Sequence, residues 1–171
     1  SVTDQHNKRL NRYGLKIRRV MSPATAALVR HALSRVVARG TARRLLQDFP
    51  DTQPLAGKTG TSDDNRDSWF AGFGANRLAV AWVGRDDNGT TGLTGGSGAL
   101  RLWSAAMQRG EIESLPTTLP ADLSWQNVDL NRTIILPEAC TNGERMPVHK
   151  RSALPRLDSC TSAGNTPTTQ G

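Results

Sequence analysis

The sequence has few of the residues that build metal centres, and it has no hydrophobic run long enough to cross a bilayer. Its 171 residues include only two cysteines and three histidines, which are widely separated. A structural zinc site needs four such ligands at close spacing, so we predict no metal, and we predict no other cofactor. A membrane-spanning helix needs about 20 consecutive apolar residues, so we predict no membrane segment in this chain.

Signatures of nucleic-acid binding are also missing, although the chain is basic. The formal net charge is +7, and residues 1–44 contain eleven Lys or Arg against a single acidic residue. There is no zinc-finger spacing, no RNA-binding aromatic signature and no recognisable helix-turn-helix, so we predict no nucleic-acid partner. A solvated basic face explains the charge best, and proximity to anionic lipid or to acidic polymers is the alternative.

The most informative segment is a short stretch that reads as a strand and ends in Lys58-Thr59-Gly60-Thr61. On a strand, side chains alternate between faces, so Lys58 and Gly60 point one way while Thr59 and Thr61 point the other. Gly60 lets another backbone approach closely, and an unpaired edge could accept an extended peptide. Lys58 could attract a carboxylate, and the hydroxyls with a backbone N–H near Thr61 could bind developing negative charge. This pattern favours acyl transfer on a peptide; the alternative is a Gly-rich strand end with a solvated lysine.

Two further strands are predicted directly after this segment, around residues 67–73 and 78–86. Three consecutive strands with short connections indicate an antiparallel meander, and the composition allows one domain-sized core with polar extensions. We therefore predict an α+β fold in which helices flank this meander.

At this point the chain resembles the transpeptidase domain of the bifunctional, class A penicillin-binding proteins of Gram-negative bacteria. The resemblance covers residues 2–107 and continues more weakly to residue 160. It rests on a series of motifs in family order: Arg39-Gly40-Thr41-Ala42, Gly57-Lys58-Thr59-Gly60-Thr61-Ser62, Asp67, Trp69-Phe70-Ala71-Gly72 and Trp82-Val83-Gly84-Arg85-Asp86. The resemblance implies the penicillin-recognising serine transpeptidase fold, similar to that of β-lactamases.

The resemblance also implies a site and its ligands. Lys58 and Thr61 would be catalytic residues, and Lys58, Thr59, Gly60 and Thr61 would bind peptidoglycan stem peptides or β-lactams. The family also needs a Ser-x-x-Lys and a Ser-x-Asn motif, and neither occurs in these 171 residues. We therefore expect the chain to be a C-terminal fragment that is inactive alone, with the nucleophilic serine, a glycosyltransferase domain and a membrane anchor upstream. Its expected place is the periplasmic face of the inner membrane, with cell-wall synthesis activators as further partners.

Two helices are predicted on either side of the meander. Ser22 is a suitable N-cap with Pro23 at the first helical position, apolar residues recur at helical spacing, and Gly40 ends the pattern. The second helix follows a Thr- and Gly-rich loop and places Ala99, Leu100, Trp103 and Met107 on one face. We interpret Trp103 as a core side chain and favour the same role for Trp69 and Trp82, with a lining of a ligand cleft as the alternative for these two. We interpret Arg30, Arg35 and Arg39 as arginines whose charges stay solvated. A small hairpin is expected at residues 2–13.

From residue 111 the character changes to prolines and short apolar groups with few clear periods. We predict a transpeptidase portion at residues 1–110, a small extension at 111–160 with one strand near 132–136, and a disordered tail at 161–171. Cys140 and Cys160 lie in the extension. Two cysteines in a loop-rich segment indicate a disulfide in an oxidising compartment, and the resembled proteins carry a cysteine pair there; two independent thiols are the alternative.

Other functions remain open from the sequence. A DD-carboxypeptidase or a serine β-lactamase would share the Lys-Thr-Gly motif, although the tryptophan-containing motifs and the long extension resemble the bifunctional synthases more closely. The third alternative is a non-enzymatic basic binding module.

Overall fold

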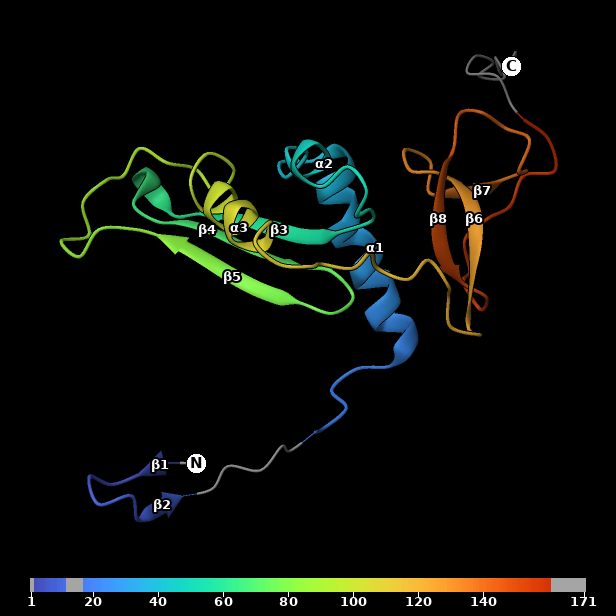
Figure 1. The fold of residues 1–171 in the computed structure, drawn as a ribbon. Helices are drawn as coiled ribbons and strands as arrows, with labels where there is room; N and C mark the ends of the chain where they lie inside the picture. The colour runs from blue at the N-terminus through green and yellow to red at the C-terminus, as the bar shows by residue number, and fades with distance from the viewer. Residues whose placement is uncertain (1, 12–16, 161–171) are drawn as a thin grey trace.

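The fold consists of two antiparallel sheets with a long helix between them (Figure 1). This computed structural model describes residues 2–11 and 17–160. The first sheet has the order β3-β4-β5 and the second the order β7-β6-β8, and a two-stranded hairpin, β1-β2, precedes them. The predicted α+β class with an antiparallel meander is confirmed.

The N-terminal hairpin joins β1 (Val2–Thr3) to β2 (Arg9–Asn11), as the sequence predicts. The Asp4 carboxylate holds the turn by accepting hydrogen bonds from the backbone N–H groups of His6 and Lys8, each at 2.9 Å. Such a side-chain bond to the following backbone is typical of aspartate in turns. Tyr13, which we placed in the second arm, lies outside the described residues.

The first long helix, α1, covers Pro23–Arg39 and begins and ends as predicted. The Ser22 hydroxyl accepts a hydrogen bond from the backbone N–H of Thr25 at 3.1 Å, which satisfies one of the free donors of the first turn. The short helix α2 (Leu45–Asp48), which we did not predict, follows after a turn. Both helices contribute to the core: Val37 and Leu45 are fully buried.

The first sheet consists of β3 (Ala56–Thr61), β4 (Ser68–Phe73) and β5 (Leu78–Val83), paired without a bulge. Alternate side chains point to opposite faces. One face carries Phe70 and Ala81 and is covered by α3 (Ala99–Met107), whose Leu100 and Trp103 are buried against it. This face holds the main hydrophobic core, and Trp103 is a core residue as predicted.

The opposite face of the same sheet is apolar but exposed. Trp69 and Trp82 are each 45% exposed, and their rings lie 6.0 Å apart between centroids. Val80 and Leu78 on β5 are 57% and 71% exposed. Our interpretation of Trp69 and Trp82 as core side chains is wrong for this chain, because no described segment covers them.

The second sheet consists of β6 (Leu123–Asp129), β7 (Ile134–Leu136) and β8 (Glu144–His149). Only β7 falls in the strand that we predicted. Pro147 is accommodated because β8 lies at the border of this sheet, where a missing N–H need not break the pairing. Cys140 and Cys160 form a disulfide that ties the loop after β7 to the end of the described chain. The predicted domain boundary at residue 110 stays a prediction, and the tail at 161–171 lies outside the described residues.

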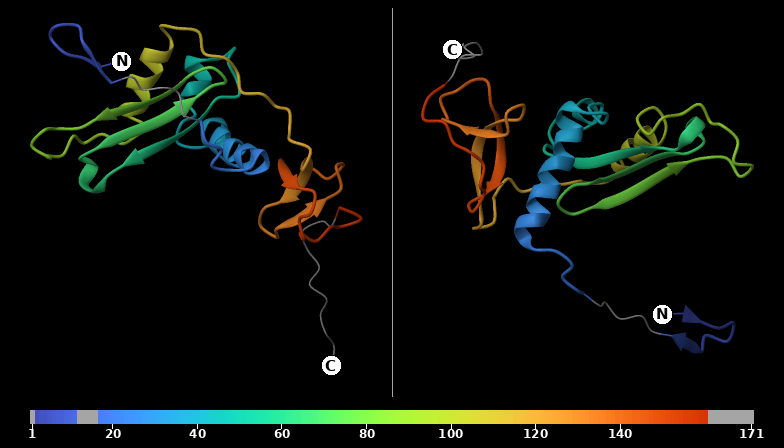
Figure 2. Two further views of the ribbon diagram at one scale, coloured as in Figure 1. Left: turned by 90° about the horizontal axis from the view of Figure 1, so that it is seen from below. Right: turned by 180° about the vertical axis from the view of Figure 1, so that it is seen from behind.

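Helix α1 joins the two sheets, as the rear view in Figure 2 also shows. Ala24 and Ala27 pack against Leu123 of β6, and farther along the helix Arg35 and Arg39 both pair with Glu144 of β8. Arg39 Nη1 lies 3.2 Å from Glu144 Oε2. Our expectation of solvated charges is wrong for Arg35, whose side chain is only 28% exposed beside this carboxylate. Arg39 also pairs with Glu144, but its side chain is 69% exposed and its charge stays in contact with solvent, as predicted.

A partly buried histidine, His31, lies at this junction. The His31 ring packs edge-on against Trp125, with 5.6 Å between ring centroids. Burial lowers the pKa of His31 below its ordinary value, and Arg35 adds to the effect, while Glu144 acts in the opposite direction. The folded chain therefore favours the neutral imidazole.

We expect the free energy of unfolding to fall as the pH drops from above 6.5 toward the lowered pKa of His31. In that window the unfolded chain binds a proton that the folded chain does not, so protonation favours unfolding. Above the pKa of histidine in the unfolded chain, the contribution of neutral His31 to the free energy of unfolding is fully present. Denaturant titrations between about pH 8 and about pH 5 would measure the loss, which His31→Gln should reduce. His6→Gln, in the exposed hairpin turn, is the control and should keep the pH dependence of the unaltered chain. An equal pH dependence of the unaltered chain, His31→Gln and His6→Gln would contradict the prediction.

Candidate functional site

The predicted site lies on β3, at one border of the first sheet. Strand β3 pairs with β4 alone, so its other side has no strand partner among the described residues. Lys58 and Thr61 are exposed, whereas Thr59 and Gly60 are half-buried. The structure thus brings the four predicted residues together on an accessible border strand, and their catalytic and binding roles stay predictions.

Lys58 and the two threonines lie on opposite faces, as the alternation predicts. The Lys58 Nζ donates a hydrogen bond to the carbonyl oxygen of Thr59 at 2.8 Å. It has no carboxylate partner among the salt bridges of the described residues. Its positive charge is therefore available to an anionic group that enters from the exposed apolar face.

The hydroxyl of Thr59 is fixed from outside the strand. It lies 2.7 Å from the hydroxyl of Thr41, which belongs to the upstream Arg39-Gly40-Thr41-Ala42 motif. Two motifs that are 18 residues apart in the sequence thus meet in one hydrogen bond. The sequence named both motifs but did not predict this contact.

The hydroxyl of Thr61 holds the loop between β5 and α3. It accepts a hydrogen bond from the backbone N–H of Gly95 at 2.9 Å. A Cβ on Gly95 would lie 2.7 Å from the carbonyl oxygens of both Gly60 and Trp69, so only glycine allows the loop to lie this close to the two strands. Sequence analysis missed this loop as part of the site, although its Thr and Gly content was a signal.

Gly60 lies beside Trp69 and close to the loop backbone at Gly95. A Cβ at this position would lie 3.1 Å from Cβ of Trp69, the residue opposite it on β4. The space above Gly60 is therefore bordered by an aromatic side chain on the exposed face. Room for a donor peptide at Gly60 stays a prediction.

The loop after β5 is ordered by its own charges. The Arg85 guanidinium donates two hydrogen bonds to the Asp87 carboxylate, at 2.9 and 2.6 Å. This contact, with a further hydrogen bond from the N–H of Gly89, lowers the pKa of Asp87 to about 2. Asp67 accepts a hydrogen bond from the Trp82 indole N–H at 2.8 Å, so these family-like motifs also contact one another.

No metal or membrane feature accompanies this site. In residues 2–11 and 17–160, no group of three or more His, Cys, Asp or Glu side chains lies close enough together to hold a metal ion. Within the same ranges, no helix has both the length and the apolar composition needed to cross a bilayer.

Comparison with known proteins identifies the family. The chain is 37% identical over 129 residues to penicillin-binding protein 1B of Haemophilus influenzae, covering 75% of this chain and 16% of that protein. It is 37% identical over 125 residues to penicillin-binding protein 1B of Escherichia coli strain K12, covering 72% of this chain and 14% of that protein. The chain belongs to the penicillin-binding proteins. No family model matches the chain.

A solved structure supports the same assignment. The crystal structure of penicillin-binding protein 1A from Haemophilus influenzae superposes with a TM-score of 0.70 at 26% identity, covering 84% of this chain and 22% of that one. The predicted penicillin-binding fold is confirmed, and so is the predicted family resemblance, with penicillin-binding protein 1B among the relatives. The chain spans 14% to 17% of the length of the curated 1B relatives from Haemophilus influenzae, Vibrio cholerae and Escherichia coli.

Proposed function

We propose that this chain forms one wall of the active site of a peptidoglycan DD-transpeptidase, within a longer penicillin-binding protein. The observation that carries the proposal is the position of Lys58 on the border strand of the first sheet. Lys58 is exposed and has no carboxylate partner among the described salt bridges. The sheet face that carries it is apolar, and no described segment covers that face. A catalytic segment supplied by the rest of the protein would pack on this face and meet Lys58 there. The isolated chain would then be inactive.

The chemistry assigns a role to each residue of β3. A serine outside these 171 residues attacks the carbonyl of the penultimate D-alanine in a stem peptide, and the bond to the terminal D-alanine breaks as that residue takes up a proton. Lys58 provides positive potential to the serine and hydrogen bonds within its network. Thr59 and Thr61 seat the substrate carboxylate, and the backbone N–H of Thr61 helps to stabilise the oxyanion. The acyl group then passes from the serine to an amine of a neighbouring stem.

The exposed apolar face gives this proposal physical support. Apolar side chains on both faces of a sheet are typical of sheets that are covered on both sides. Trp69, Val80 and Trp82 would be costly to leave in water, since burying an apolar side chain contributes about 1.5–3 kcal/mol. The remainder of the transpeptidase domain is the covering segment in this proposal.

The intact protein would work at the periplasmic face of the bacterial inner membrane. In that arrangement a glycosyltransferase domain and a membrane anchor precede this chain, and cell-wall synthesis activators are possible regulators. The Cys140–Cys160 disulfide supports this placement, because disulfides persist in oxidising compartments.

Labelling by a fluorescent penicillin tests the proposal, because a β-lactam acylates the same serine. In the longer protein, we expect Lys58→Ala to slow labelling about a hundredfold, since one electrostatic contact to the reacting group typically contributes that much or more. Lys150→Ala, which removes an exposed lysine in the turn directly after β8, is the matched control and should label at the normal rate. The isolated 171-residue chain should not be labelled.

Labelling of the isolated chain would refute the proposal that the nucleophilic serine lies outside these residues. Equal labelling rates for the two lysine variants would refute the proposed role of Lys58. Thr61→Ala is less informative, because it also removes the acceptor that holds Gly95. Transfer of the acyl group to an added amine, compared with hydrolysis, separates a transpeptidase from a carboxypeptidase.

A further inference from the structure

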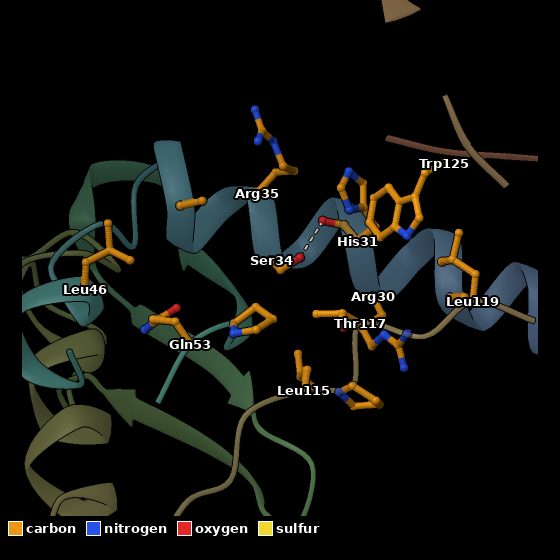
Figure 3. A pocket seen from close by; sticks show the side chains of 14 residues that line it. Arg30, His31, Ser34, Arg35, Leu46, Gln53, Leu115, Thr117, Leu119 and Trp125 are labelled. Carbon is orange, nitrogen blue, oxygen red and sulfur yellow. Dashed lines mark hydrogen bonds between the residues drawn. The ribbon is translucent and has the colours of Figure 1, made fainter. Parts of the chain in front are cut away.

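A cavity of about 400 Å³ lies at the junction of α1, the segment before β3 and the connection between the two sheets (Figure 3). Lys58 does not line it. Its size falls within the range of small-molecule sites, about 300–1,000 Å³. The cavity exists only because segments around residues 46–54 and 115–125 fold against the same helix.

The walls of this cavity are mostly apolar. Leu46, Pro54, Leu115 and Leu119 line it, and the Trp125 ring closes one end beside His31. Figure 3 shows Leu46, Gln53 and Leu115 below α1, and Trp125 beside His31 toward the other end of the lining. Such a lining accommodates a flat or branched apolar group of a ligand.

The charged groups of the lining are all basic, since it contains two arginines and no Asp or Glu. The guanidinium of Arg35 is paired with Glu144 and points away from the cavity. Arg30 donates one hydrogen bond to the carbonyl oxygen of Thr118 at 3.3 Å and has no carboxylate partner among the salt bridges of the described residues. Arg30 lines the cavity together with Thr117 and Leu119, and its guanidinium has further N–H groups besides the one that Thr118 accepts.

We propose that this cavity binds a small amphipathic anion, in which a carboxylate pairs with Arg30 and an apolar body lies between α1 and Trp125. A guanidinium pairs with a carboxylate through two parallel hydrogen bonds, and a low-dielectric wall strengthens that pair. A neutral ligand of the same shape gains the apolar contacts only. The inference does not depend on the proposed transpeptidase function, because it uses none of the residues of β3.

Three probes with the same naphthalene body and different charge test the proposal on the full 171-residue chain: 2-naphthoate, the isosteric neutral 2-naphthamide and the cationic 2-naphthylmethylamine. Calorimetry measures the dissociation constants, and amide NMR shifts locate the site. We expect naphthoate to bind about tenfold more tightly than naphthamide, because hydrogen bonds to charged groups contribute more than neutral ones. The cation should bind most weakly. The shifted signals should be those of His31, Leu115 and Trp125.

Two variants and one control separate the charge contact from the cavity itself. Arg30→Gln keeps an N–H donor but loses the charge. It should reduce the affinity for naphthoate to that for naphthamide and leave the affinity for naphthamide unchanged. Ser34→Leu adds a larger side chain inside the lining and should weaken both probes. Arg101→Gln, on the exposed side of α3, loses the same charge elsewhere and should bind as the unaltered chain does.

Several outcomes would overturn the proposal. Equal affinity for naphthoate and naphthamide would show that the cavity has no preference for an anion. Equal losses of naphthoate affinity in Arg30→Gln and Arg101→Gln would show that Arg30 does not bind the carboxylate. Shifts that map to Trp69 and Trp82 would place the binding on the exposed sheet face instead. Thermal unfolding of each variant checks the fold, and the Arg30→Gln comparison decides the question even if Ser34→Leu unfolds.

Discussion

Trp103→Ala is expected to lower the free energy of unfolding by about 3–5 kcal/mol, the usual cost of deleting a buried tryptophan side chain. Trp103 is 1% exposed and packs edge-on against Phe49 and Phe70, at 6.0 and 5.3 Å between ring centroids. Its indole N–H donates to the carbonyl oxygen of Ala79 at 3.1 Å, so the truncation also removes a bond to β5. Denaturant unfolding measures the loss.

The neighbouring residue provides the control for this experiment. Leu102 lies on the same helix and is 52% exposed, so Leu102→Ala keeps the helix and removes little packing. We expect a change below about 1 kcal/mol for this surface truncation. Similar losses for Leu102→Ala and Trp103→Ala would show that the helix, and not the aromatic cluster, determines the stability.

Ser68→Ala is expected to cost about 2–4 kcal/mol, because one buried hydroxyl satisfies two backbone groups and each unsatisfied group costs about 1–3 kcal/mol. The Ser68 hydroxyl donates to the carbonyl oxygen of Thr94 at 2.7 Å and accepts from the N–H of Ala99 at 2.8 Å. Ser68 has no exposed surface. The substitution removes only the hydroxyl, so overpacking does not complicate the result.

Ser97→Ala is the matched control, since this exposed serine bonds within the same loop. Its loss should be below about 1 kcal/mol, because water replaces an exposed partner. Hydrogen exchange at the Ala99 amide gives a second measurement: Ser68→Ala should make it exchange faster, and Ser97→Ala should leave it largely protected. Unchanged protection in Ser68→Ala would contradict the assigned contact.

The local signals in the sequence were sufficient for part of the fold. Ser22 and Pro23 mark the start of α1 because capping depends on neighbouring residues alone, and the alternation along residues 68–73 reflects one buried and one exposed face. The alternation along β3 correctly predicted that the side chains of Lys58 and Thr59 lie on opposite faces of the strand. These features depend on chain geometry over a few residues, which a sequence displays directly.

The missed features depend on contacts between distant residues. Strands β6 and β8 lack a clear alternation, because most residues of β6 are half-buried and β8 contains Pro147. The contact of Thr61 with Gly95 spans 34 residues, and that of Arg39 with Glu144 spans 105. Nothing in the local pattern of either partner indicates the other.

The two exposed tryptophans show a further limit. A large aromatic side chain in a strand normally indicates burial, and the pattern of Trp69 and Trp82 is that of a buried face. Whether such a face is covered depends on what packs against it. In this chain α3 covers one face of the sheet, and the described residues leave the other open.

The two arginine contacts to Glu144 give α1 a mechanical role. One helix contacts both the strand that carries Lys58 and the strand that carries Glu144. A packed helix transmits displacement as a rigid rod, because its backbone hydrogen bonds resist stretching over its 17 residues. We expect a pull on β8 to be transmitted through α1 toward the Thr41–Thr59 contact beside Lys58.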